Sequence, residues 1–276
     1  MSTVLLTPNA LSLEFLDTGF RKLADNLTKA LHLYMHDMQS YMASTVKSLS
    51  SSTTIGFAPN PTLDKYVAEA HYINLAEVGI PVPVGLNVPL KEYLDALELN
   101  QAIVDRLLKD TYKPAIAYFS TLLASPEQLA SVSIQREEAK ILRFNDDRED
   151  AVKAVSGCFV KNDRVEYVRY GDVYARNADW VSCNKRLVDL TAKLATTPPS
   201  LVNTQVNTLC ELIDKLADRI RQSPDTYAVT GINAKGISQL AYDLARVTEF
   251  YGAYYFLVQT LVASMDDTAK KIRSVI

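Results

Sequence analysis

Hydrophobic side chains recur at alternating steps of three and four residues along the last part of the chain. This spacing places them on one face of an α-helix and continues over roughly five heptads. It predicts a long C-terminal helix that packs lengthwise against other helices. The residues of this face are Ile237, Leu240, Leu244, Val247, Tyr251, Tyr254, Val258, Leu261, Met265, Thr268, Ile272 and Val275.

The stretch YGAYYFLVQTL, residues 251–261, holds four aromatic residues inside this pattern. Such a stretch could be an interfacial lipid-binding helix, an aromatic ligand pocket or a buried helix-packing seam. The aromatic residues keep the register of the apolar face, which favours the seam. The polar face is not rich in Lys or Arg, which argues against lipid binding. The predicted seam residues are Leu244, Val247, Tyr251, Tyr254, Val258 and Leu261, with Phe256 and Leu257 expected to widen the buried stripe.

A second long helical pattern occupies the start of the chain. Apolar residues from Leu16 to Tyr41 follow the same steps of three and four. They predict a helix over about residues 9–49, which the serine- and threonine-rich run SLSSSTT then ends.

Shorter helical patterns occupy most of the remaining sequence. The predicted helices cover residues 62–78, 90–124, 126–144, 178–195 and 200–222. Pro114 is expected to kink or divide the third predicted helix of the chain, because proline lacks an N–H group and clashes with the preceding turn. The stretch GIPVPVGLNVP, residues 79–89, contains three prolines and predicts a rigid extended connection.

The segment from 151 to 176 changes character. It is rich in Val and Tyr, alternates with a period of two around residues 165–170, and carries turn residues in KNDR. This pattern predicts a β-hairpin inserted in a helical chain. We therefore predict a mainly α fold: an elongated helical bundle with long N- and C-terminal helices and a small β-hairpin insertion. Residues 1–276 are expected to form a single domain.

Composition narrows the possible functions. Hydrophobic residues make up 48% of the chain and the net charge is −3, with both signs interspersed. No overall field favours nucleic acid. The N-terminal sequence lacks a basic region, so we expect no secretory signal peptide. The apolar run near residue 255 is broken by Gln259, so we expect no membrane span. A virion or cytoplasmic location is the expectation.

Few residue patterns in the sequence indicate a catalytic, metal-binding or nucleotide-binding site. His32 and His36 share a helix face but need a third metal ligand. The loop before the last helix resembles GxxxxGK[ST] only in part, because Ile237 stands where lysine would reach the phosphates. The acidic run NDDRED, residues 145–150, lacks the ligand spacing of a calcium loop, and the three cysteines lack zinc spacing. We expect no cofactor, no metal site and no enzymatic activity.

The predicted hairpin carries the most suggestive surface chemistry. Cations alternate with aromatic side chains there, a composition common at protein interfaces and in single-stranded nucleic-acid binding. Acidic neighbours cancel much of the charge, which weakens the nucleic-acid interpretation. Simple packing on the bundle is the other alternative. The candidate interface residues are Arg164, Tyr167, Arg169, Tyr170, Tyr174 and Arg176.

These observations lead to an expected function. We expect a non-enzymatic structural or assembly protein that binds other protein subunits as a homo- or hetero-oligomer. A component of a large complex such as a tailed-phage virion is our expectation, from general sequence character rather than from any motif. The alternative is a helical regulatory or adaptor protein that binds a partner helix. A bundle-core enzyme using carboxylates and a membrane-perforating protein are further alternatives.

Overall fold

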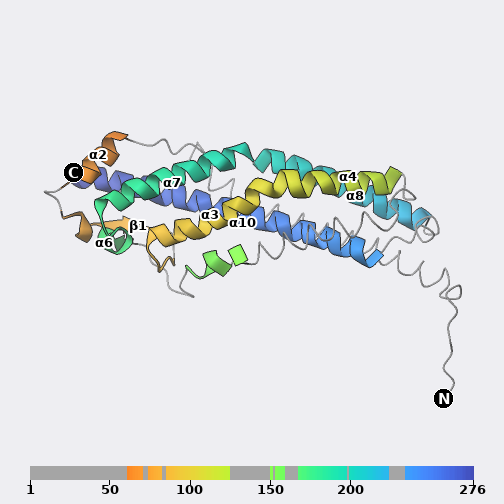
Figure 1. Ribbon diagram of the computed structural model, residues 1–276, viewed down its shortest axis with the longest axis horizontal. Coiled ribbons are helices and arrows are strands. Elements are labelled where there is room, and N and C mark those ends of the chain that lie inside the picture. Colours follow the sequence, from red (N-terminus) through yellow and green to blue (C-terminus); the bar gives the residue numbers. More distant parts are fainter. Residues whose placement is uncertain are drawn as a thin grey trace, which may run out of the picture. The chain divides into compact units, whose positions relative to one another are not determined.

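The computed structural model describes residues 61–70, 74–82, 85–124, 150–151, 153–158, 167–197, 199–223 and 234–276. Most of these residues are helical, which confirms the mainly α prediction, and a small antiparallel sheet accompanies the helices (Figure 1). The predicted helices over residues 9–49 and 126–144 lie outside the described residues. The helices are α2 (Pro61–Glu69), η1 (Leu75–Glu77), α3 (Leu90–Arg106), η2 (Leu107–Tyr112), α4 (Lys113–Ala124), α6 (Tyr170–Val173), α7 (Asn177–Thr196), α8 (Pro199–Gln222) and α10 (Ala234–Val275).

The chain divides into two compact units. Among the described residues, the first unit holds η2, α4, α8 and the part of α10 up to Phe250. The second unit holds α2, η1, the sheet, α6, α7, nearly all of α3 and the part of α10 from Tyr251 onward. The single domain expected from the sequence stays a prediction, because compactness alone does not show whether either unit folds by itself.

The first unit is built on the packing of α4 against α8 (Figure 1). The inward side chains of α8 follow steps of three and four residues, which keeps them on one helix face. Arg219 of α8 donates a hydrogen bond to the carbonyl oxygen of Leu123 at the end of α4. The buried side chains of this helix pair include Phe119, Leu122, Val206, Leu209, Ile213, Leu216 and Ile220.

The helix leading into α4 is widened to a π-helix over η2. Here the N–H of Lys113 reaches the carbonyl of Leu108, five residues back rather than four. Pro114 follows directly; it has no N–H to donate, and its ring clashes with the carbonyl four residues before it in a regular α-helix. Widening the preceding turn is a known way to accommodate such a defect. The expected disturbance at Pro114 thus takes the form of a π segment.

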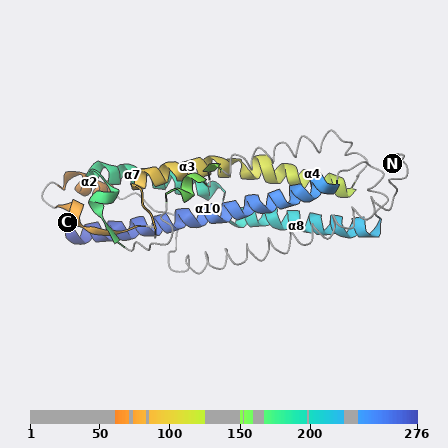
Figure 2. The ribbon, with the colours of Figure 1, turned by 90° about the horizontal axis from the view of Figure 1, so that it is seen from below.

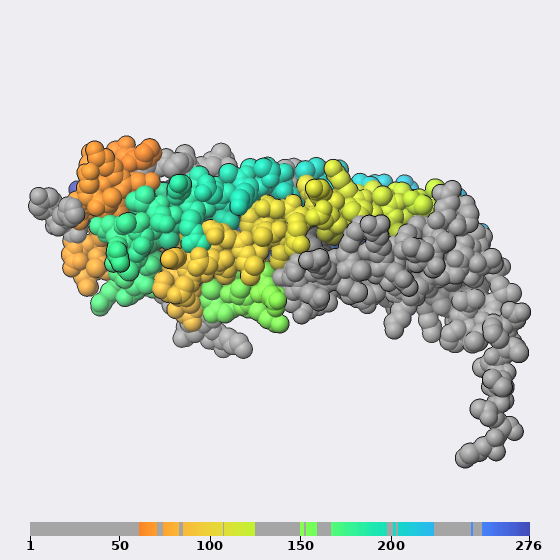
Figure 3. All heavy atoms as spheres, in the orientation of Figure 1, coloured from red at the N-terminus to blue at the C-terminus, as the bar shows by residue number. Residues whose placement is uncertain are grey.

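In the second unit, α10 runs alongside α3 and α7 (Figure 2). The only tryptophan, Trp180, is fully buried at the start of α7, as is Tyr93 of α3. The predicted helix over residues 62–78 is shorter than expected: α2 ends at Glu69, and Leu75–Glu77 forms a separate 3-10 turn. In the space-filling view, α2 and the start of α7 lie side by side on the visible face (Figure 3).

The small sheet corrects the predicted hairpin. Its strands are β1 (Gly79–Pro81) and β2 (Tyr167–Arg169), which pair antiparallel although 85 or more residues separate them in sequence. Within the predicted hairpin, residues 151 and 153–156 are helical, and the chain enters α6 directly after Arg169. The proline-rich connection supplies the partner strand, because its extended backbone already suits a sheet.

The apolar face of α10 is buried where the structure describes it. Leu244, Tyr251, Tyr254, Val258 and Leu261 are at most 4% exposed. The side chain of Val247 lies outside the described part of the chain. Phe256 is 39% exposed, so it does not widen the buried stripe as expected. It is five residues after Tyr251, which turns it away from the face that Tyr251 and Tyr254 share.

Candidate protein interface

The pairing of β1 with β2 fixes which backbone groups of β2 face outward. The N–H of Tyr170 donates to the carbonyl of Val78 at 2.8 Å, and Ile80 lies opposite Val168. In an antiparallel pair, hydrogen-bonded and non-hydrogen-bonded residue pairs alternate. The hydrogen-bonded positions of β2 are therefore Val168 and Tyr170. The backbone N–H groups of Tyr167 and Arg169, and the carbonyl of Tyr167, point away from β1.

At the opposite edge of the sheet, one carbonyl of β1 is bonded to α10. The carbonyl of Pro81 accepts hydrogen bonds from Ser264 Oγ at 2.8 Å and from Thr268 Oγ1 at 3.1 Å. Pro81 occupies a non-hydrogen-bonded position opposite Tyr167, where a missing N–H costs no ladder bond. The sheet is thus attached to α10 through β1, and its remaining edge is the outer edge of β2.

Two side chains of β2 stand in solvent on one face of the sheet. Tyr167 is 67% exposed, and the side chain of Arg169 is 66% exposed. They are two residues apart, so they project on the same side of the strand. Arg169 Nη1 lies 3.6 Å from a carboxylate oxygen of Glu77 in η1, which is itself exposed. This group of Tyr167, Arg169 and Glu77 is called the strand-edge patch below.

The structure turns two of the predicted interface residues inward. Tyr170 and Tyr174 are each 2% exposed and contact one another with ring centroids 4.8 Å apart. Tyr174 also packs edge-on against Trp180 at 5.8 Å and donates its hydroxyl to the sulfur of Met265 at 3.1 Å. Burial raises the pKa of both tyrosines above the ordinary value. They belong to the interior of this chain and offer no surface to another subunit.

Helix α6 turns the chain inward directly after the exposed strand. A β-carbon added at Gly171 would lie 3.1 Å from the β-carbon of Ala76, so α6 approaches η1 more closely than a larger residue comfortably allows. Arg176 is exposed just before α7, and its backbone N–H donates to Asp179 Oδ2 at 3.0 Å. Arg164 lies outside the described residues.

A carboxylate ties α2 to α7. Asp64 Oδ1 accepts hydrogen bonds from Trp180 Nε1 at 3.2 Å and from Asn184 Nδ2 at 3.3 Å. Charge-assisted hydrogen bonds of this kind are stronger than neutral ones. They hold the short helix α2 against a much longer one.

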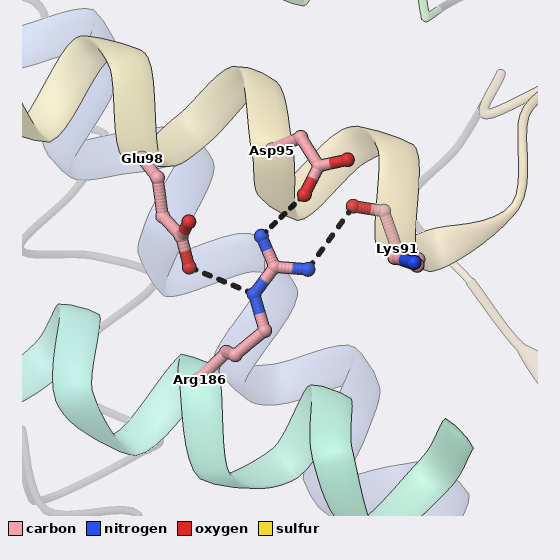
Figure 4. Close-up of polar contacts among 4 residues, drawn as sticks. All are labelled: Lys91, Asp95, Glu98 and Arg186. Carbon is pink, nitrogen blue, oxygen red and sulfur yellow. Dashed lines mark hydrogen bonds and ion pairs between the residues drawn. The ribbon is translucent and has the colours of Figure 1, made fainter.

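A second polar group joins α7 to α3. Arg186 donates to Glu98 Oε1 at 2.8 Å, to Asp95 Oδ1 at 2.6 Å and to the carbonyl of Lys91 at 3.4 Å (Figure 4). The Arg186 side chain is only 20% exposed. Its hydrogen bonds to Glu98 and Asp95 raise its pKa above the ordinary value, so it stays charged at any accessible pH. Three acceptors from one neighbouring helix make Arg186 a cross-link between α7 and α3.

The interior face of α10 is also fixed by specific hydrogen bonds. Tyr254 donates its hydroxyl to Gln101 Oε1 at 2.9 Å, and Gln101 Nε2 donates to Asp105 Oδ1 at 2.6 Å. Tyr251 donates to the carbonyl of Thr197 at 2.5 Å. Buried hydroxyls that have found partners favour one register of packing. Two of the predicted seam residues therefore carry polar contacts as well as apolar ones.

The cysteines of the described chain are free thiols. Burial raises the pKa of Cys183 to about 11. Burial, with Asp214 and Glu211 nearby, raises the pKa of Cys210 to about 12. A thiol is nucleophilic as the thiolate, so both are poorly reactive at neutral pH.

The structure describes only some of the other residues that could bind a metal or a nucleotide. His32 and His36 lie outside the described residues, and the glycine loop is described only from Ala234, where α10 begins. Asp150 is exposed and lies 3.9 Å from Lys153 Nζ. Within the described ranges, no three His, Cys, Asp or Glu side chains gather as metal ligands. None of the helices described has the length and apolarity needed to cross a bilayer.

Comparison with known proteins identifies no relative. No family model, no curated protein and no solved structure matches this chain.

The sequence pattern missed Glu77 as a member of the strand-edge patch, and it missed the residues that anchor the sheet to α10. Glu77 was assigned to a helix, and Pro81 to a connection. Ser264 and Thr268 gave no sign of binding a strand, although Thr268 lies on the apolar face of α10. A hydroxyl residue within an apolar helix face is the signal that could have predicted a buried polar partner there.

Proposed function

We propose that this protein is a non-enzymatic structural or assembly component of a larger protein complex, such as a tailed-phage virion. Its partners are other protein subunits in a homo- or hetero-oligomer. The observation that carries the proposal is the strand-edge patch. There an exposed aromatic ring, an exposed guanidinium and outward-facing backbone groups lie on a strand held firmly by helices.

The chemistry of this patch suits protein partners. Tyr and Arg are enriched among the residues that contribute most to protein interfaces. Glu77 balances the charge of Arg169, and an evenly balanced patch is a poor match for a phosphate backbone. We propose no nucleic acid, cofactor or metal as a ligand. The tailed-phage virion is named on sequence character alone.

An adaptor that binds a partner helix is the alternative function. Two apolar side chains favour it: Leu99 of α3 is 47% exposed and Phe256 of α10 is 39% exposed. Exposed apolar side chains on helices are the anchors of helix-in-groove recognition. This function predicts a one-to-one complex with a single helical segment rather than a large assembly.

Size fractionation of a native extract tests the proposal. The endogenous protein, followed by an antibody or by mass spectrometry, is expected to elute as a particle many times heavier than its own 30.7 kDa. Reversible cross-linking before fractionation preserves weak complexes. Elution at the mass of one chain, with or without cross-linking, would contradict an assembly role. Elution with one small partner would favour the adaptor.

A further inference from the structure

We infer that the outer edge of β2 binds a second copy of this chain, with the two β2 strands antiparallel across a two-fold axis at Tyr167. The inference rests on the proposed function, since it assigns a specific partner to the strand-edge patch.

The backbone of Tyr167 is complementary to itself. Its N–H and its carbonyl both point away from β1, as the pairing of Val168 and Tyr170 with β1 requires. In an antiparallel pair, two directly opposed residues exchange both of their hydrogen bonds. Two copies of Tyr167 can therefore satisfy one another completely. The outward N–H of Arg169 lies on the same edge and therefore also faces a second strand placed there.

The side chains are complementary in the same arrangement. Two Tyr167 rings come opposite one another on one face of the joined sheet. Each Arg169 then lies diagonally across from the ring of the second copy, within reach of a long side chain. A guanidinium over an aromatic face is attractive. A contact on a two-fold axis must match its own surface, and a ring two residues from a cation on one strand face meets that requirement.

The charges of the patch also allow self-association. Arg169 and Glu77 carry opposite charges 3.6 Å apart, and both are more than 60% exposed. Two copies of a patch that holds one charge of each sign do not repel one another as two cationic patches would. A patch holding only cations would resist this pairing.

The strand β2 is also fixed in its extended conformation within a single chain. Ser264 and Thr268 hold β1 at Pro81, and β1 holds β2. The segment after β2 is fixed by the buried rings of Tyr170 and Tyr174. Little ordering of β2 is needed on binding, which lowers the entropic cost of association.

Light scattering after size-exclusion chromatography of the full chain tests this inference. The wild-type protein is expected to show about twice the 30.7 kDa mass of one chain at high concentration and to approach one chain on dilution. Tyr167→Ala is expected to weaken the dimer at least about tenfold. Tyr66→Ala is the matched control, because Tyr66 is a 57% exposed tyrosine on α2, and it is expected to dimerise like the wild type.

A pair of substitutions at Arg169 separates the backbone contribution from the side chain. Arg169 has φ −70°, which proline adopts without strain, and its N–H faces outward. Arg169→Ala removes the guanidinium alone, whereas Arg169→Pro also removes the N–H. The proline variant is expected to dimerise about tenfold more weakly than the alanine variant. Circular dichroism and thermal melting check that both variants keep the fold.

Two results would overturn the inference. One is a wild-type chain that stays at one-chain mass up to the highest soluble concentration. The other is a wild-type oligomer that neither Tyr167→Ala nor Arg169→Pro weakens. A chain that is heavy in the native extract and monomeric when pure would defeat this inference and leave the proposed function standing. A chain that dimerises when pure and also elutes from the extract as an isolated dimer would support this inference and contradict the proposed function.

Discussion

Two neighbouring segments of the chain both carry tyrosines, but one segment is exposed to solvent and the other is buried. Tyr167 and Arg169, on β2, stand in solvent, whereas Tyr170 and Tyr174, in and after α6, are buried beside Trp180. All four were expected to form one exposed interface. The two pairs differ because the strand β2 ends at Arg169 and the helical turn α6 begins at Tyr170. Side chains alternate between two faces along a strand but follow a different period in a helix, so the residues after Arg169 point in other directions.

This contrast shows that composition does not decide exposure here. The buried tyrosines are restrained by ring contacts and by the Tyr174–Met265 hydrogen bond. The exposed one has 67% of its surface in water. A substitution in the buried segment should therefore affect stability, and one in the exposed segment should affect association.

Tyr174→Ala should be the most damaging of these changes. It removes a fully buried ring that contacts Tyr170 and Trp180, and the cavity left behind costs about 3–5 kcal/mol of unfolding free energy. Urea denaturation followed by circular dichroism measures it. Tyr174→Phe keeps the ring and loses only the hydroxyl, so it should cost about 1 kcal/mol. Equal losses in the two variants would contradict the packing account.

Arg186→Ala should have an intermediate effect. It leaves Asp95 and Glu98 without their shared cation and removes three hydrogen bonds between α7 and α3. We expect a loss of about 1–2 kcal/mol, reduced in high salt because both carboxylates are partly exposed. Lys215→Ala is the control, since its pair with Glu211 is exposed and should contribute under about 0.5 kcal/mol. If Arg186→Ala lowers the free energy of unfolding no more than the control does, Arg186 does not stabilise the contact between α7 and α3.

Alkaline pH should weaken the fold through its buried thiols. The unfolded chain releases a thiol proton near pH 9, whereas folded Cys183 holds its proton to a pKa of about 11. The folded state therefore binds more protons in this window, so the free energy of unfolding falls as pH rises from 9 to 11, by at most about 1.4 kcal/mol per pH unit for each thiol. Denaturation at pH 8, 9 and 10 measures the slope. Cys183→Ala should reduce the slope but not abolish it, because Cys210 also has a raised pKa, and an unchanged slope would contradict the assignment.

Tyr167→Ala should barely change stability. Its side chain is 67% exposed, and surface changes of this kind stay within about 0.5 kcal/mol. Denaturation in urea, carried out below the dimerisation range, gives the value. A loss comparable to that of Tyr174→Ala would mean that Tyr167 is part of the core, and the contrast between the two regions would disappear.

Local periodicity predicted the helices well. The helix expected over 178–195 is α7 (Asn177–Thr196), and the one expected over 200–222 is α8 (Pro199–Gln222). Both have long apolar stripes and clear punctuation at TTPPS, and such signals are local. The C-terminal stripe from Ile237 predicted most of α10 in the same way.

The features that the sequence pattern did not predict depend on contacts between distant segments. Nothing near residue 167 indicates that its partner is Gly79–Pro81, because strand pairing depends on where the helices bring two segments together. Tyr170 and Tyr174 looked like surface residues because period-two alternation was extended through a helical turn. Of the predicted interface residues, Tyr167 and Arg169 belong to the strand-edge patch. The hydrogen bonds of Ser264 and Thr268 that anchor the sheet could be identified only from the structure.

Amide hydrogen exchange of β2, followed residue by residue by NMR at low and high protein concentration, tests whether two chains meet at this strand edge. We expect the N–H groups of Tyr167 and Arg169 to exchange rapidly in dilute solution and to become protected as the concentration rises. The N–H of Tyr170, which is bonded to Val78 in the single chain, should be protected at both concentrations. Rapid exchange of Tyr167 and Arg169 at every concentration would contradict the claim that this edge is where the protein assembles.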